Sequence, residues 1–538
     1  MLGLVAAAIL MVAVVPKAAL AQAITGFSPP KGPVGVQVTI SGAGFADATD
    51  VQFNGTSASF TVDDDATISA TVPQGATTGP ITVVTSDGEA TSTDAFIVQP
   101  NVVLILTDDQ RWDEMSFMPK LQAGLTDEGV SFAPNGIISD PLCCPSRATI
   151  LTGTYSHTNG IYLNNDDGGF HLFTQRGDDQ NTIATVLHAQ GYRTGLVGKY
   201  LNGYSVPYHN YIPPGWDSWF ATLDVRENAA YYDWEATDNG TKLHFGSSPA
   251  SYSTTVFDEQ AQAFIDSTPA DQPLFLYLAP RAPHSPMTPA PKYAGSLAGL
   301  VPNLTDQPNF NEADVSDKPH YVQRLPLLTP HRIQKDQLEY EHQFETLRSV
   351  DDMVGHVVDE LQADGRLSNT LLIFLSDQGM ELGSHRLEGK LVPYEESIRT
   401  PFIIRWDALG IAPRTDASVV SNVDLAATIA DAAGTTMPGT EGLSLLPLMK
   451  DPGMDWRPDV LLEHQGSPSN PGYCGVRSAD DVYIQYATGE EELYDLVADP
   501  DQLNNQASNP DFLTILKSMR AEDHVLCDPP PPGFVWTH

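Results

Sequence analysis

The sequence predicts an α/β domain, preceded by a small β-sandwich and followed by a smaller C-terminal subdomain. Continuous apolar runs occur at residues 102–106, 274–278 and 371–375. Such runs are typical of strands buried on both faces of a largely parallel sheet. Helical patterns lie between them, at 182–189 and, over a longer stretch, at 337–363. This alternation of strands and helices indicates an α/β architecture.

The segment 24–98 has a different pattern. Short stretches of alternating apolar and polar residues are separated at regular intervals by Gly, Pro and Asp, which predicts an Ig-like sandwich. The segment "ITGFSPPKGPVGVQVTISGAGF" resembles the IPT/TIG family of Ig-like domains. No catalytic constellation is visible in it, so a passive spacer and a binding module both remain open.

Length and charge limit the classes of function. A chain of 538 residues is too long for one core and suggests several folding units. It carries 68 acidic against 28 basic residues, a formal net charge of -40. Such a surface repels nucleic acid and anionic membranes, which we exclude as partners. The acidity is typical of a soluble protein in an extracellular or salty setting.

The N-terminus predicts export. An apolar run at 2–15 is followed by small residues at 19–21, which indicates a signal peptide over 1–21, although the usual basic segment before the run is missing. The run is short for a membrane span, and no other run is long enough. We therefore expect a secreted or extracytoplasmic protein with no membrane span in the mature chain. In an oxidising compartment Cys474 and Cys527 could form a disulfide.

Acidic side chains follow two of the predicted strands. Asp108 and Asp109 end one run, and Asp377 and Gln378 end another. If the two strands are neighbours, these groups converge at the carboxyl edge of the sheet. Clustered carboxylates need a cation to stay ionised, and hard oxygen ligands favour Ca²⁺, or less readily Mg²⁺. Taken alone, each pair could equally be solvated loop acids.

The segment "CCPSRATILTG" at 143–153 predicts a helix that begins at the two cysteines, because Pro145 is followed by good helix formers. A helix N-terminus offers free N–H groups and partial positive charge to an anion. Cys143 could therefore be a nucleophile activated by Arg147. It could also be a buried apolar cysteine, which is the commoner case.

The same segment resembles the signature of the sulfatase family, within the alkaline-phosphatase-like superfamily. Five blocks match in order: "LTDDQ", "CCPSRATILTG", "GKYLNGY", "APHSP" and "SDQGMELGSHRLEGKLVPYEESIRTPFII". The resemblance runs from Asn101 to the "ELYDLVADPDQLNN" segment. In these motifs the chain is most similar to the group containing N-acetylglucosamine-6-sulfatases and extracellular endosulfatases.

The resemblance implies a mixed sheet sandwiched by helices over 101–440, with a small α+β subdomain and tail over 441–538. It also implies that a formylglycine-generating enzyme oxidises Cys143, and not the adjacent Cys144, to formylglycine. The modified residue would then help to hold calcium together with Asp108, Asp109, Asp377 and Gln378.

Catalytic roles follow from the same match. Arg147 would steady the formylglycine, and Lys199 and Lys390 would clamp the sulfate oxygens. His284 would help the alcohol depart. The hydrated aldehyde would attack sulfur and expel the alcohol, and sulfate would then be eliminated to regenerate the aldehyde. Two lysines and a dication suit the charge that shifts in such a transition state.

Two positions depart from the family pattern. Gln378 stands where many sulfatases have Asn, and Leu201 stands where many have a histidine two residues after the lysine. Another base must then assist the elimination, if any does. His385 and His157 are the candidates, and the alternative for each is a structural histidine bonded within its surroundings.

The sequence therefore predicts a sulfuric ester hydrolase acting on a sulfated sugar or another small organic sulfate. A phosphonate monoester or phosphodiester hydrolase of the same superfamily is the second hypothesis. A non-catalytic extracellular protein that binds glycans is the third. The net charge of -40 favours a small substrate over a long polyanionic chain.

Overall fold

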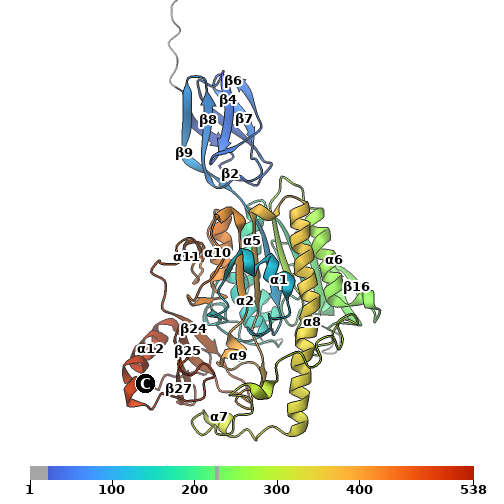
Figure 1. Ribbon diagram of the computed structural model, residues 1–538, viewed down its shortest axis with the longest axis vertical. Helices are drawn as coiled ribbons and strands as arrows, with labels where there is room; N and C mark the ends of the chain where they lie inside the picture. Colours follow the sequence, from blue (N-terminus) through green and yellow to red (C-terminus); the bar gives the residue numbers. More distant parts are fainter. Residues whose placement is uncertain (1–21, 166–167, 225–229, 538) are drawn as a thin grey trace, which may run out of the picture. The chain divides into compact units, whose positions relative to one another are not determined.

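The computed structural model describes residues 22–165, 168–224 and 230–537. The expected signal peptide at 1–21 lies outside the described residues. The chain divides into two compact units, Met1–Val98 and Gln99–His538, and each is described by itself (Figure 1).

The first unit consists of two facing β-sheets. One has the strand order β1 (Ala23–Ser28), β3 (Gln37–Ala43), β7 (Thr67–Thr71) and β6 (Phe60–Asp64). The other has the order β2 (Lys31–Gly32), β9 (Gly88–Val98), β8 (Gly79–Thr85), β4 (Ala48–Phe53) and β5 (Thr56–Ser57). Inward-facing side chains such as Val38, Ile40, Val51 and Val83 are fully buried between them. The Ig-like sandwich is thus confirmed.

The second unit is built on a ten-stranded mixed sheet. Its strands, in spatial order, are β16 (Thr241–Phe245), β15 (Trp234–Asp238), β14 (Ser218–Leu223), β13 (Arg193–Gly198), β17 (Leu274–Ala279), β10 (Asn101–Thr107), β18 (Thr370–Ser376), β21 (Phe402–Arg405), β11 (Val130–Ser131) and β22 (Arg414–Thr415). The five strands from β14 to β18 run parallel, and β15, β16 and β21 pair antiparallel with their neighbours. The predicted α/β fold with a mixed sheet is confirmed.

The central strands are apolar on both faces because helices cover both sides. On β10, Leu104 packs into one hydrophobic cluster and Val103 into the other. The first cluster includes α2 (Cys143–Thr152), α5 (Ile183–Ala189) and α10 (Asp424–Ala432). The second includes α1 (Pro119–Gly124), α6 (Ser253–Asp266) and α8 (Pro330–Ala363), and Figure 1 shows α6 and α8 side by side. The solid apolar runs of the sequence are explained by this three-layer arrangement.

Helix α8 begins earlier than the sequence pattern predicts. The pattern places its start near residue 337, whereas the helix begins at Pro330. The Thr329 side chain accepts a hydrogen bond from the Arg332 N–H, and proline occupies the first helical position. Both features stabilise a helix N-terminus. The first two turns carry little apolar periodicity because they extend past the core.

The C-terminal part of this unit holds a four-stranded antiparallel sheet and a helix. The strands are β24 (Asp459–His464), β25 (Tyr473–Ser478), β26 (Asp481–Tyr486) and β27 (Glu491–Asp495), and the helix is α12 (Leu513–Leu526). A disulfide between Cys474 and Cys527 joins β25 to the end of α12, as the sequence allowed. Among the described residues, no helix is both long and apolar enough to cross a membrane.

Candidate active site

The ends of β10 and β18 bring the two acidic pairs together. The strands are parallel neighbours in a register that sets Thr107 opposite Ser376, so the residues that follow emerge side by side. Oxygens of Asp108, Asp109 and Asp377 lie within 4.8 Å of one another, and all three side chains are buried. Asp109 has a φ of 71°, a conformation that Asp tolerates better than most residues. Its N–H donates to Asp377 Oδ1 at 3.2 Å, which fixes this turn.

Helix α2 presents Cys143 to these carboxylates. Cys143 is its first residue, after Leu142 in extended conformation. The Sγ atom lies 3.1 Å from Lys390 Nζ, 3.4 Å from Gln378 Nε2 and 3.7 Å from Asp108 Oδ1. Cys143 is fully buried, at a helix N-terminus where partial positive charge favours an anion.

Basic side chains alternate with the carboxylates. Arg147 lies one turn along α2 from Cys143 and donates from Nε to Asp377 Oδ2 at 2.7 Å. Lys199 Nζ donates to Asp108 Oδ2 at 2.7 Å, and Lys390 donates to Asp109 Oδ1. Each of these three basic side chains is thus held by an oppositely charged partner.

Lys199 is placed by the glycine before it. Gly198 ends β13 with a φ of 111°, and a Cβ there would lie 2.1 Å from the Ala279 carbonyl oxygen. Only glycine fits this close approach to β17. The Lys199 N–H then donates to that same oxygen at 2.8 Å, which aims the lysine side chain at Asp108.

The pKa shifts describe a site with competing charges. Burial would raise the pKa of Asp108, but Lys199, His284 and Arg147 hold it well below its usual range. Burial and the adjacent Asp108 raise the pKa of Asp377 to about 6, despite Arg147. The basic partners therefore do not fully offset three carboxylates packed together. Additional positive charge would stabilise the ionised cluster.

The donor set fits a hard cation. Three buried carboxylates and an amide face one point, and the Gln378 Oε1 atom is buried without a hydrogen-bond partner. A half-turn of that amide would exchange its oxygen and nitrogen and bring the oxygen toward Asp109 and Cys143. Oxygen ligands of this kind suit Ca²⁺ or Mg²⁺. The sequence expectation that Asp108, Asp109, Asp377 and Gln378 converge agrees with this geometry.

His284 lies at the rim of the same cluster. Its Nε2 is 3.7 Å from Asp109 Oδ2, and its Nδ1 lies 2.7 Å from the Ser285 carbonyl oxygen. Because a carbonyl oxygen can only accept, the proton sits on Nδ1, and Nε2 is the nitrogen that faces the site. The Tyr231 hydroxyl donates to the His284 carbonyl and steadies this loop.

The other two histidines do not join the cluster. His157 Nδ1 lies 3.2 Å from Glu463 Oε2, and His385 Nδ1 lies 2.6 Å from Glu312 Oε2. In the described part of the chain, neither has a contact with Cys143. Hydrogen bonds to Glu441 and Glu463 outweigh burial and raise the pKa of His157 to about 10. The structural alternative of the sequence analysis therefore accounts for the environment of both.

Sequence reasoning missed the residues that anchor α2. Asn164 Oδ1 accepts from the Cys144 N–H at 2.8 Å, and Asn422 Nδ2 donates to Ser146 Oγ at 3.1 Å. The Asn202 N–H donates to Cys144 Sγ at 3.1 Å, so Cys144 points away from the carboxylates. Isolated asparagines in loops gave no signal, because their partners lie 20 to 276 residues away along the chain.

A buried cysteine, three carboxylates and two lysines gather at the carboxyl edge of a mixed sheet of the alkaline-phosphatase-like class. Residues 100–435 match the family model "Sulfatase", so the chain belongs to the sulfatase family. It is a sulfuric ester hydrolase. Members of this family generally use formylglycine and a divalent metal.

Two further family models match the chain outside or across this region. Residues 383–526 match the C-terminal model of N-sulphoglucosamine sulphohydrolase. Residues 23–98 match the IPT/TIG domain, in agreement with the sandwich of the first unit.

Relatives are similar over most of the second unit. Human N-acetylglucosamine-6-sulfatase is 33% identical over 461 residues, which cover 77% of this chain and 82% of that protein. The extracellular sulfatase SULF-1 homolog of Drosophila melanogaster is 33% identical over 380 residues, covering 68% of this chain and 33% of that protein. A structure solved with its substrate D-glucosamine-2-N,6-O-disulfate is 25% identical with a TM-score of 0.67, covering 80% of this chain and 98% of that one.

Proposed function

We propose that the chain is a secreted, calcium-dependent sulfatase that removes sulfate from a sulfated sugar or similar small alcohol, with formylglycine at position 143. The observation that carries the proposal is the position of Cys143. It starts α2 and lies within 3.7 Å of Lys390, Gln378 and Asp108. A matching enzyme that generates formylglycine would be needed during maturation.

The cation would be held by Asp108, Asp109, Asp377 and Gln378, together with the modified residue 143. Bound there, it would polarise a sulfate oxygen and acidify the attacking hydroxyl. An aldehyde at position 143 would supply, through its hydrate, a nucleophile that can release sulfate again. In the net reaction the ester S–O bond breaks, water supplies an oxygen to sulfate, and the alcohol gains a proton.

The chain's own side chains would orient the substrate. Lys199 and Lys390 are anchored by Asp108 and Asp109, so their ammonium groups are already positioned for anionic oxygens. Preorganised cations of this kind stabilise charge that develops in a transition state. Arg147 would act as a positioning residue, because it bonds Asp377 and the Lys199 carbonyl oxygen at 2.9 Å.

His284 would deliver the proton to the departing alcohol. Its Nδ1 is engaged by the Ser285 carbonyl, so only Nε2 can exchange a proton with a substrate. Burial lowers the pKa of His284, whereas Asp108 and Asp109 act in the opposite direction. The lowered pKa makes the protonated ring a stronger acid, which favours transfer of the Nε2 proton to the alcohol.

Secretion is supported by the apolar N-terminal run, by the disulfide between Cys474 and Cys527, and by the likeness to an extracellular sulfatase homolog. The sugar substrate is supported by relatives that are named for N-acetylglucosamine-6-sulfate or were solved with a sulfated glucosamine.

Mass analysis of the peptide that holds Cys143 tests the proposal. Conversion of the thiol to the aldehyde lowers the peptide mass by about 18 Da, whereas ordinary oxidation adds oxygen. The protein should be purified from its native cell and assayed with 4-nitrophenyl sulfate and 4-nitrophenyl phenylphosphonate. An unmodified thiol, or faster cleavage of the phosphonate, would contradict the proposal.

A further inference from the structure

Lys390 lies at the end of a short β-hairpin. The strands of this hairpin are β19 (Glu381–Leu382) and β20 (Glu388–Gly389), which pair antiparallel. Lys390 follows β20 directly, and its Nζ lies 3.1 Å from Cys143 Sγ. Each strand has only two residues, and a two-stranded hairpin of this length has little stability of its own. Contacts outside the hairpin must therefore fix Lys390.

The other end of the hairpin is fixed by the central sheet. Gln378 lies just after the end of β18, and its Nε2 is 3.4 Å from Cys143 Sγ. The Ser376 hydroxyl donates to the Gln378 carbonyl oxygen at 2.8 Å, which anchors this residue to the strand. Lys390 is separated from β18 by the whole hairpin, so its position depends on how the turn between β19 and β20 is held.

This turn is held by Arg386. Its guanidinium donates three hydrogen bonds to main-chain carbonyl oxygens of segment 312–325: from Nε to Glu312 at 2.8 Å, from Nη1 to Leu325 at 2.9 Å and from Nη2 to Ala313 at 2.9 Å. A guanidinium presents several donors in a rigid plane, so it can serve three acceptors at once. One side chain thus joins the hairpin to both ends of this segment.

His385, the neighbour of Arg386, connects the turn to the same part of the chain. Its Nδ1 lies 2.6 Å from Glu312 Oε2, and its N–H donates to the Asn309 carbonyl oxygen at 2.8 Å. Glu312 therefore binds the turn twice, through its main-chain oxygen and through its carboxylate. The histidine is fully buried, so this second connection is shielded from water.

The backbone around Lys390 adopts a conformation that most side chains disfavour. His385, Arg386 and Leu391 have φ values of 51°, 65° and 79°, in the region that favours glycine. Non-glycine residues stay in this region where their surroundings determine the conformation, and they concentrate at functional sites. For Arg386 the determining contacts are its three hydrogen bonds to segment 312–325.

The segment that Arg386 holds continues into the wall of a cavity beside the catalytic cluster. This cavity, of about 640 Å³, is lined by Arg386, Lys390 and residues 325–329. Direct contact of Arg386 with the substrate is therefore the competing explanation. It is disfavoured because Nε, Nη1 and Nη2 each already donate to a carbonyl oxygen, which turns the guanidinium toward the protein.

Resting on the proposed function, we infer that Arg386 is a positioning residue for Lys390. By joining the hairpin turn to segment 312–325, Arg386 holds the Lys390 ammonium group at the place where the sulfate oxygens bind. Arg386 acts through Lys390 and not by contact with the substrate.

Arg386→Gly tests the role of the guanidinium without straining the backbone. Glycine favours a φ of 65°, so we expect this variant to fold. In protein that carries the aldehyde at position 143, kcat for 4-nitrophenyl sulfate should fall about tenfold or more, since small displacements of a reacting group are costly. Arg386→Lys keeps the charge but not the planar donor group, and should remain slow. A wild-type kcat in either variant would overturn the inference.

A double-mutant cycle separates positioning from direct contact. Lys390→Met removes the ammonium group and keeps most of the side chain. Adding Arg386→Gly to Lys390→Met should lower kcat by a further factor of about two or less, because no ammonium group is left to position. A further loss as large as in the wild-type background would show that Arg386 acts independently of Lys390, and would overturn the inference.

Arg366 is the matched control, because its guanidinium also donates to three main-chain carbonyl oxygens. The acceptors are those of Thr268 at 2.6 Å, Pro269 at 2.8 Å and Gln272 at 3.1 Å. Arg366 precedes β18, at the end of the strand opposite to the site. Arg366→Ala should therefore lower the melting temperature and leave kcat unchanged. Equal losses of kcat in Arg366→Ala and Arg386→Gly would overturn the inference, since general destabilisation would then explain both.

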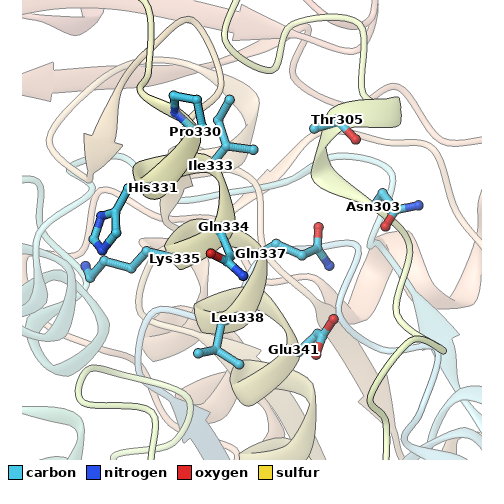
Figure 2. A pocket seen from close by; sticks show the side chains of 10 residues that line it. All are labelled: Asn303, Thr305, Pro330, His331, Ile333, Gln334, Lys335, Gln337, Leu338 and Glu341. Atoms are coloured by element: carbon cyan, nitrogen blue, oxygen red, sulfur yellow. The ribbon is translucent and has the colours of Figure 1, made fainter.

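A second control accounts for the loss of a positive charge. Figure 2 shows another cavity, of about 820 Å³, along the first turns of α8, with Lys335 projecting from the helix. The Lys335 Nζ atom lies 2.8 Å from Glu339 Oε1 on the same helix. Lys335→Gln removes one positive charge and leaves the hairpin bonds intact, so its kcat should equal that of the wild type. A loss like that of Arg386→Gly would overturn the inference, because charge and not the cross-link would then matter.

Hydrogen exchange measures the hold on the hairpin without turnover. Within the turn, the Gly383 N–H donates to the Leu387 carbonyl oxygen at 2.8 Å. In Arg386→Gly, exchange of the amides of residues 383–387 should be about tenfold faster or more, because local opening becomes easier, whereas Arg366→Ala should leave it unchanged. Exchange at the wild-type rate in Arg386→Gly would overturn the inference. If wild-type protein with the aldehyde releases no sulfate from 4-nitrophenyl sulfate while exchange is accelerated in Arg386→Gly, the cross-link stands but the proposed function, and with it the role of Lys390, is overturned.

Discussion

Arg147 and Asp377 form a fully buried ion pair, with Arg147 Nε 2.7 Å from Asp377 Oδ2. The arginine comes from the second turn of α2 and the aspartate from the end of β18. The pair therefore links the nucleophile helix to the carboxylates of the central sheet. Arg147 NH2 also lies 3.9 Å from Asp108 Oδ2, so one guanidinium serves two carboxylates.

Removal of this guanidinium should destabilise the fold. Arg147→Ala leaves two buried carboxylates with less compensation, and breaking a buried pair typically costs about 3–5 kcal/mol. Urea unfolding should show that loss in the free energy of unfolding. Arg176→Ala breaks an exposed pair with Asp178 and should cost less than about 1 kcal/mol. Comparable losses in the two variants would contradict the structural role of Arg147.

The two adjacent cysteines should behave differently. Cys143→Ala removes the group that faces the carboxylates and should lower kcat about a thousandfold or more, as expected when a nucleophile is lost. Cys144→Ala removes a buried sulfur that accepts from the Asn202 N–H, and should lower stability by about 1–2 kcal/mol with little change in kcat. Assays with 4-nitrophenyl sulfate and thermal melts separate the two effects. Loss of catalysis in Cys144→Ala but not in Cys143→Ala would show that Cys144, and not Cys143, is the nucleophile.

Chelation of the cation should lower both the catalytic activity and the free energy of unfolding. Without a cation, the raised pKa of Asp377, about 6, shows that the carboxylate cluster is incompletely compensated. We expect EDTA to lower kcat at least about a hundredfold and Ca²⁺ to restore it better than Mg²⁺. A saturating cation should raise the free energy of unfolding by about 2.7 kcal/mol at a hundredfold excess over Kd.

Gln378 provides the matched variants for this experiment. Gln378→Asn keeps the amide oxygen on a shorter arm, and Gln378→Leu keeps the size but removes the oxygen. The Ca²⁺ concentration that restores half of the activity should rise modestly in Gln378→Asn and by about tenfold or more in Gln378→Leu. Equal midpoints in both variants would show that this amide does not bind the cation.

The sequence predicted that the two acidic pairs converge, because these residues follow strand ends. Apolar runs located β10 and β18, and their parallel pairing made Asp108 and Asp377 neighbours. The start of α8 was misplaced because its first turns lack apolar periodicity. The anchors of α2 were also missed, since a hydrogen bond such as that from Asn422 to Ser146 joins residues 276 positions apart and leaves no local pattern.

His157 should stabilise the folded protein and should not act as the base that assists sulfate elimination. Burial lowers its pKa, but hydrogen bonds to Glu441 and Glu463 prevail and raise it from 6.5 to about 10. The ring is therefore protonated at neutral pH and cannot accept a proton there. His157→Gln should leave kcat near the wild-type value, whereas loss of a general base would lower kcat about a hundredfold or more.

The pH dependence of stability provides the second readout for His157. A raised pKa in the folded state stabilises the protein fully below the unfolded value of 6.5, and this stabilisation is lost as pH rises through about 10. The difference in the midpoint of urea unfolding between the wild-type protein and His157→Gln should therefore be largest near pH 6 and shrink toward pH 10. His244→Gln removes an exposed partner of Asp233 and should show no such trend. A difference for His157→Gln that stays constant across this range would show that its charge does not stabilise the fold.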